Sequence, residues 1–135
     1  DIKSVNLLAN VLARQRAKEA GVFEAILVRE GTVTEGSVSN VMVVRNGAVQ
    51  TAPEGRRILS GVTRAIVLDL ARKEGIPVAE SFVTREELLA ASEVFLTGTT
   101  VEVLPVVRVD GHAIGGGSPG PVSQLLSRRF EALVG

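Results

Sequence analysis

The sequence has no cysteine, tryptophan or tyrosine, and it has only one histidine and four phenylalanines. Without cysteine, neither a disulfide framework nor a thiolate metal site can form, and the single His112 cannot build a histidine cluster. The aromatic residues are too few to form the stacking platforms that bind single-stranded nucleic acid. We therefore expect no metal site, and any chemistry must use residues other than thiols and imidazole clusters.

Charges of the two signs balance, with 15 lysine and arginine residues against 15 aspartate and glutamate residues. A chain without a net field has no electrostatic attraction for nucleic acid or an anionic membrane. The sequence also has no secretory signal and no apolar run long enough to span a bilayer. We expect a soluble, cytoplasmic protein with no nucleic-acid or membrane partner. Because no methionine precedes Asp1, we expect that residue to be a cut or processed end.

The chain length of 135 residues fits one domain, and 45% hydrophobic residues are ample for a core. No internal repeat and no domain boundary is visible. Helical and strand patterns are mixed along the chain, and several predicted strands are joined by tight turns. We therefore expect an α+β (mixed α/β) fold rather than a doubly wound parallel sheet.

The first expected element is a helix over residues 5–20, capped by Ser4 and ended by Gly21. This expectation rests on apolar residues at helical spacing, which are Val5, Leu8, Val11 and Leu12.

Local turn and cap signals predict much of the remaining structure. Asn46-Gly47 between two β-rich runs predicts a hairpin. Gly75 is a natural helix stop, and Thr84 with Glu87 matches a capping box. The other expected elements are strands over 23–30, within 31–40 and over 77–83, two strands within 93–114 with a turn at Asp110-Gly111, helices over 61–76, 85–91 and 122–134, and a loop from Ala113 to Gly120.

Two donor-rich segments are candidates for binding an anion. Ser60-Gly61-Val62-Thr63 leads into a helix, so Thr63 is either an ordinary N-cap or, with Gly61, part of an anion-binding turn. Gly98-Thr99-Thr100 interrupts an apolar strand and is either a bulge or turn, or a second set of donors. Two such segments could converge on one phosphate.

Charged residues leave similar alternatives open. Glu35 is either a solvated carboxylate at a turn or a buried one that pairs with a ligand cation. Lys3 is either a solvated charge near a terminus or a nucleophile, which would require burial or a neighbouring cation. We expect His112 to be exposed and Arg64 to lie at the surface or at a helix start.

Taken together, "DIKSVNLL", "VTEGSVSN", "ILSGVTR" and "LTGTTVEVLPV" resemble, in this order, segments of the fold-type IV pyridoxal-phosphate transaminases. This family includes D-amino-acid transaminases, branched-chain aminotransferases and aminodeoxychorismate lyases. The resemblance covers essentially the whole chain and is closest to the D-amino-acid transaminases, whose spacing fits the interval from Lys3 to Glu35. The ordered set of motifs carries the resemblance, since each motif alone is weak.

The resemblance implies roles for individual residues. Lys3 matches the lysine that forms the Schiff base with the cofactor and then moves the proton between substrate and cofactor. Glu35 matches the carboxylate that keeps the pyridine nitrogen protonated, so that the ring acts as an electron sink. The remaining matches are Val62 (backbone N–H), Thr63 and Thr99 at the phosphate, with Gly61 allowing close approach, Leu59 and Ser39 at the ring, and Thr100 on the substrate side.

Departures from the family pattern leave the substrate mixed. Val38 stands where D-amino-acid transaminases often carry serine, and Gly98 before Thr99 resembles the branched-chain enzymes. Thr100 resembles the D-specific enzymes instead. The leading hypothesis is an aminotransferase that favours D-amino acids, and the alternatives are a branched-chain aminotransferase, an aminodeoxychorismate lyase-like enzyme and a non-catalytic fragment of the same fold.

The resemblance also predicts that residues 1–135 form the C-terminal, cofactor-binding domain. The family's small N-terminal domain supplies an arginine to the cofactor phosphate and most substrate-binding side chains, and it has no counterpart in this sequence. We therefore expect a companion chain or a preceding domain, a homodimer, and amino-acid and keto-acid substrates.

Overall fold

The computed structural model describes the backbone of residues 4–15, 18–29, 32–36, 40–53, 58–98, 102–109 and 111–134, and side chains from residue 40 onward except 54–60 within these ranges. Strands and helices are mixed along the chain, which confirms the expected α+β class. The elements in chain order are β1 Ser4–Gln15, β2 Lys18–Arg29, β3 Thr32–Gly36, β4 Asn40–Arg45, β5 Ala48–Thr51, α1 Ile58–Lys73, β6 Val78–Glu80, β7 Val83–Thr84, α2 Arg85–Ala90, β8 Glu93–Gly98, β9 Glu102–Val106, β10 Arg108–Val109, β11 His112–Ala113 and α3 Pro121–Val134.

The expected helix over residues 5–20 is wrong, because residues 5–15 belong to β1 and residues 18–20 to β2. The two strands pair antiparallel, with Ser4 opposite Arg29 and Gln15 opposite Lys18, and Gly21 lies inside β2. In the sequence, apolar residues also recur at every second position: Val5, Leu7, Ala9, Val11 and Ala13. The same residues therefore fit a two-residue period as well as a helical one, and the long ladder with β2 decides for the strand.

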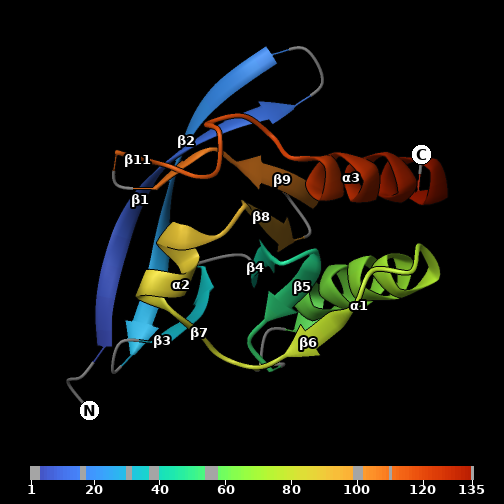
Figure 1. Ribbon diagram of the computed structural model, residues 1–135, viewed down its shortest axis with the longest axis horizontal. Helices are drawn as coiled ribbons and strands as arrows, with labels where there is room; N and C mark the ends of the chain where they lie inside the picture. Colours follow the sequence, from blue (N-terminus) through green and yellow to red (C-terminus); the bar gives the residue numbers. More distant parts are fainter. Residues whose placement is uncertain are drawn as a thin grey trace.

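A five-stranded sheet in the order β6-β5-β4-β8-β9 forms the centre of the fold. Helices α1 and α3 cover one of its faces (Figure 1). Helix α2 lies on the other face, toward the four-stranded sheet β1-β2-β3-β7 (Figure 1). A short hairpin of β10 and β11 completes the set of strands in the described ranges.

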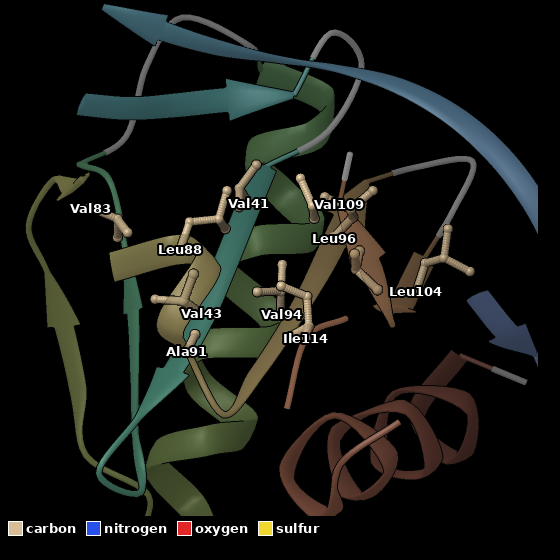
Figure 2. Close-up of a cluster of buried hydrophobic side chains, with 11 residues drawn as sticks. Val41, Val43, Val83, Leu88, Ala91, Val94, Leu96, Leu104, Val109 and Ile114 are labelled. Carbon is tan, nitrogen blue, oxygen red and sulfur yellow. The ribbon is translucent and has the colours of Figure 1, made fainter. Parts of the chain in front are cut away.

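Two apolar cores occupy the two faces of the central sheet. Alternate residues of each central strand point to opposite faces, so Val94 and Leu96 of β8 belong to one core and Phe95 to the other. Figure 2 shows the first core, in which Leu88 of α2 meets β4 and β8. The second core joins Met42, Val44, Phe95 and Val103 of the sheet to Val67, Leu68 and Ala71 of α1 and to Leu126 and Phe130 of α3.

Three local sequence signals are confirmed. Asn46 and Gly47 have φ of +53° and +76°, as a type I′ hairpin turn between β4 and β5 requires. Gly75 has φ of +78° and ends α1, and the amides of Gly75 and Ile76 donate to the carbonyls of Arg72 and Ala71, which is a Schellman motif. The capping box predicted at the start of α2 is also present.

The later part of the chain follows the expected order with finer divisions. The single strand expected over 77–83 is divided into β6 and β7, which belong to different sheets. The described parts of the region 93–114 form four strands instead of the expected two, and the terminal helix is present as α3. His112 is exposed, as expected. Within the described ranges, no helix combines the length and apolar character needed to cross a bilayer.

Candidate functional site

The candidate site lies at one edge of the central sheet, where β4 begins and β8 ends. Asn40, the first residue of β4, pairs with Thr97 near the end of β8. The end of β5 reaches the same edge, because Thr51 pairs with Met42 of β4. The N-terminal half of α1 is tied to this edge, since Arg64 donates to the carbonyl of Ala52, the residue after β5. The β4-β5 hairpin, the end of β8 and the N-terminal half of α1 therefore meet here.

Most of the residues predicted to hold a cofactor lie, in the sequence, within or next to the elements that form this edge. Lys3, Ser39, Thr99 and Thr100 lie outside the described residues, so their roles remain predictions. The backbone of Leu59 lies in the first turn of α1. Glu35 lies in β3 opposite Leu27 of β2, so its backbone belongs to a strand rather than to a turn.

Gly61, Val62 and Thr63 lie inside α1, which begins earlier than the sequence indicated. The helix starts at Ile58, so the interpretation of Thr63 as the N-cap is wrong. Backbone N–H groups without an intrahelical acceptor belong to the first four residues of a helix, a turn that ends at Gly61. Gly61 and Thr63 are buried, whereas Val62 is 55% exposed. A phosphate at this end would meet the first turn and the residues that immediately follow it.

Thr97 is a buried residue of this edge that the sequence did not single out. Its side chain shares the face of Phe95 two residues earlier, so it points toward the layer of α1 and α3. Thr97 is 0% exposed, and within the described part of the chain its Oγ1 atom is buried with no hydrogen-bond partner. Such groups are rare in native proteins, because an unpaired buried hydroxyl costs free energy. A polar group at this edge would satisfy it.

The backbone at this edge is also strained. Glu102 starts β9, pairs with Gly98 and has φ of +56°, in the left-handed region. This conformation costs a residue with a side chain about 1–2 kcal/mol. The strain lies beside the segment predicted to supply Thr99 and Thr100, and strained backbone of this kind is common near functional sites.

Arg64 was expected at the surface or at a helix start, but it lies in the second turn of α1 and only 4% of the residue is exposed. Its Nη2 atom donates to the carbonyl of Ala52 at 3.1 Å and to Oε1 of Glu80 at 2.8 Å. This hydrogen bond to Glu80 is the main reason that the pKa of Glu80 lies below its ordinary value. Helical spacing could have revealed the burial, because Arg64 lies one turn before the core residues Val67 and Leu68.

The described residues of this edge fit an anionic ligand. They present a buried guanidinium, the N-terminal half of a helix and three buried hydroxyl-bearing side chains, which are Thr51, Thr63 and Thr97. Among the side chains that the structure describes, no buried carboxylate lies at this edge, because Glu93 is at the opposite end of β8. A helix N-terminus with small residues and hydroxyl donors is a common phosphate-binding arrangement. The arrangement can therefore hold a phosphate group.

The chain is similar to known proteins over most of its length. The model of the family described as amino-transferase class IV matches residues 1–109. A D-alanine aminotransferase from Bacillus licheniformis is 52% identical over 131 residues, which are 97% of this chain and 46% of that protein. The chain therefore spans about half the length of the curated relatives that it matches.

Solved structures agree with the sequence relatives. A branched-chain amino acid aminotransferase from Thermobaculum terrenum, solved in its PLP (holo) form, superposes with a TM-score of 0.73 at 36% identity, covering 83% of this chain and 38% of that one. A branched-chain amino acid aminotransferase from Escherichia coli has a TM-score of 0.74 at 35% identity, covering 82% of this chain and 38% of that one.

Proposed function

Because the chain belongs to the class IV aminotransferase family, we propose that it forms the cofactor-binding part of a pyridoxal 5′-phosphate-dependent aminotransferase. Such an enzyme moves an amino group between an amino acid and a 2-keto acid in two half-reactions. The observation that carries the proposal is the sheet edge at which β4 begins, β8 ends and α1 starts. The residues assigned to the phosphate belong to α1 or directly follow β8 in the sequence, and Ser39 directly precedes β4.

We propose a separate role for each of these residues in the reaction. When bound, the cofactor supplies an aromatic ring that withdraws the electron pair left on the substrate carbon after deprotonation. Lys3 holds the cofactor covalently and carries the proton to and from that carbon. Glu35 keeps the ring nitrogen protonated, and Thr63 with Thr99 binds the phosphate. Gly61 leaves space for close approach to the helix backbone.

We propose a D-amino acid as the preferred amino donor. The curated relative from Bacillus licheniformis is named a D-alanine aminotransferase and is 52% identical to this chain. A branched-chain L-amino acid is the second candidate, favoured by Gly98 before Thr99 and by the structural neighbours at 36% and 35% identity. Comparing D-alanine with L-leucine as donors to a common 2-keto acid separates these two candidates.

The proposed enzyme needs more polypeptide than these 135 residues. Since the chain spans 46% of the D-alanine aminotransferase that it matches, we propose that a second domain or companion chain completes the substrate side of the site. We also propose a homodimer as the working assembly and the cytoplasm as its location. Size measurement of the intact natural protein in solution tests the assembly.

Lysine mapping tests the proposed function sharply, because the sequence contains lysine only at positions 3, 18 and 73. The intact natural protein is loaded with pyridoxal 5′-phosphate, reduced with borohydride and digested. We expect the pyridoxyl label on Lys3. Lys73 is a built-in control, since it lies at the exposed end of α1 and pairs with Asp69 at 3.2 Å.

The Lys3→Ala variant provides the matched measurement. It should lose both the label and transamination, whereas Lys73→Ala should retain both. Absence of the label from Lys3 in the wild-type protein, or an unchanged rate in Lys3→Ala, would refute the proposed function.

A further inference from the structure

Arg64 is a charged residue in an apolar stripe. The sheet-facing side of α1 carries Val67, Leu68 and Ala71 in the second core, and Arg64 continues this stripe one turn toward the helix start. Burying a guanidinium is costly, and replacing buried ionic groups by apolar residues of similar volume is often neutral or stabilising. Packing alone therefore does not account for an arginine at this position.

The contacts of Arg64 join three elements at the candidate site. Its Nη2 atom donates to the carbonyl of Ala52, which follows β5, and to Glu80, the last residue of β6. Strands β5 and β6 are parallel, and Thr51 pairs with Glu80, so both acceptors lie at the same end of the sheet. The guanidinium thus ties the second turn of α1 to the point where the chain leaves β5.

The ion pair itself does not explain the burial of Arg64. The side chain of Glu80 is 42% exposed, and its Oε2 atom accepts a second hydrogen bond from Arg72 at 3.3 Å. Without Arg64, the Glu80 carboxylate would still be solvated and would still be paired with Arg72. Within the described residues, Arg64 Nε is buried with no hydrogen-bond partner. The guanidinium is therefore held through its Nη2 atom alone, and its own hydrogen bonds are incomplete.

We propose that Arg64 is a positioning residue for phosphate binding. By fixing the second turn of α1 against Ala52, it sets the position of the preceding first turn and of Thr63, its neighbour in the chain, at the edge where β8 ends. A hydrogen bond to phosphate tolerates only a few tenths of an ångström of displacement, so a small shift of this turn weakens it. This inference rests on the proposed function, because the ligand is the phosphate of the cofactor.

The test compares two ligands that differ only in the phosphate group. Affinities for pyridoxal 5′-phosphate and for pyridoxal are measured by spectroscopic titration of the intact natural protein without cofactor. In Arg64→Met, the turn should shift and lose one charge-assisted hydrogen bond to the phosphate. This loss should weaken pyridoxal 5′-phosphate binding about 10- to 100-fold. Pyridoxal binding should change less than about twofold, since that affinity ratio corresponds to only about 0.4 kcal/mol.

Arg72→Met is the matched control. It removes the other cation of Glu80 from the exposed side and leaves the bond between Arg64 and Ala52 intact, so neither affinity should change. If Arg64→Met does not fold, Arg64→Lys replaces it. This variant keeps the charge but cannot reproduce the planar fork of the guanidinium, and it should lower the affinity for the phosphorylated ligand selectively.

Each outcome decides the inference. Selective weakening of pyridoxal 5′-phosphate in the Arg64 variant supports it. Equal weakening of both ligands, or a fall in stability with both affinities unchanged, shows a general structural role and overturns it. A wild-type protein that binds neither ligand refutes the proposed function, and the inference with it, so the two failures are distinguishable.

Discussion

A contact between Glu93 and the start of α3 allows a quantitative test of the fold. Glu93 is the first residue of β8, and 6% of it is exposed. Its two carboxylate oxygens accept hydrogen bonds from the backbone amides of Val122 at 3.0 Å and Ser123 at 2.8 Å. A carboxylate at a helix N-terminus is stabilised both by these amides and by the helix dipole.

Gly120 borders the same carboxylate and leaves no room for a side chain. A Cβ atom on Gly120 would overlap Cδ and Cγ of Glu93 and lie 2.6 Å from Oε1. The end of a glutamate side chain is flexible, but this one is buried and holds two amides. Gly120→Ala must therefore displace the carboxylate from α3, and it should act through the same two hydrogen bonds as Glu93→Ala.

The expected cost follows from these bonds. Hydrogen bonds to a charged group contribute about 1.5–3 kcal/mol each, so losing both would cost about 3–6 kcal/mol. The adjoining open cavity of about 460 Å³, lined in part by Ser92 and Gly120, admits water that can solvate the freed amides. We therefore expect Glu93→Ala to lower the free energy of unfolding by about 2–3 kcal/mol. Gly120→Ala should cost slightly less, about 1.5–2.5 kcal/mol, because it also restricts the unfolded chain.

The assay is urea unfolding of both single variants and the double variant. If the two substitutions act on one contact, their effects are not additive, and Gly120→Ala should change the unfolding free energy by less than about 0.5 kcal/mol when Glu93 is already alanine. Hydrogen exchange at the amides of Val122 and Ser123 should accelerate in each single variant. Gly116→Ala is the control, since its Cβ would meet no atom within 4 Å. Additive effects, or an unchanged stability in Gly120→Ala, would refute this reasoning.

Two further predictions concern α2 and acid stability. Thr84→Ala removes the hydroxyl that accepts a hydrogen bond from the Glu87 amide at 3.0 Å, and it should lower the free energy of unfolding in urea by about 1 kcal/mol. Thr84→Ser keeps a hydroxyl, so it should retain most of the wild-type stability. The pKa values of Glu80 and Glu87 lie below their ordinary value of 4.5, chiefly through hydrogen bonds from Arg64 and from the Thr84 amide respectively. A carboxyl whose pKa is lower in the folded state stabilises that state at pH values above the unfolded pKa. This stabilisation should be lost as the pH falls below 4.5. In acid-range unfolding curves, Arg64→Met should reduce the loss, because Glu80 then has a smaller pKa difference between the two states. A steeper loss in that variant would contradict the assignment.

Features that depend on a few adjacent residues were predictable from the sequence. The hairpin at Asn46-Gly47 and the end of α1 at Gly75 require positive φ, which these residue types adopt at low cost. The capping box joins residues three positions apart and is equally local. The order of the motifs also indicated the family, which the match over residues 1–109 confirms.

The errors arose where two local interpretations were both possible. Residues 5–15 satisfy a helical and a two-residue period, and only pairing with β2 selects the strand. The start of α1 at Ile58 was missed because Thr63 offered an apparent N-cap farther along the chain. Local propensity cannot decide such cases, since the free energy comes from strands and cores formed elsewhere.

The sequence by itself determined the turn at Asn46-Gly47, the end of α1 at Gly75 and the capping box of α2, and it named the residues from which a phosphate site could be built. Tertiary structure alone decided that Asn40, Thr97 and the start of α1 share one sheet edge, and that Arg64 is buried there rather than solvated. The physical reason is range. A turn is set by the φ and ψ preferences of its own residues, whereas the burial of a charge depends on acceptors such as Ala52 and Glu80, which only folding brings within hydrogen-bonding distance.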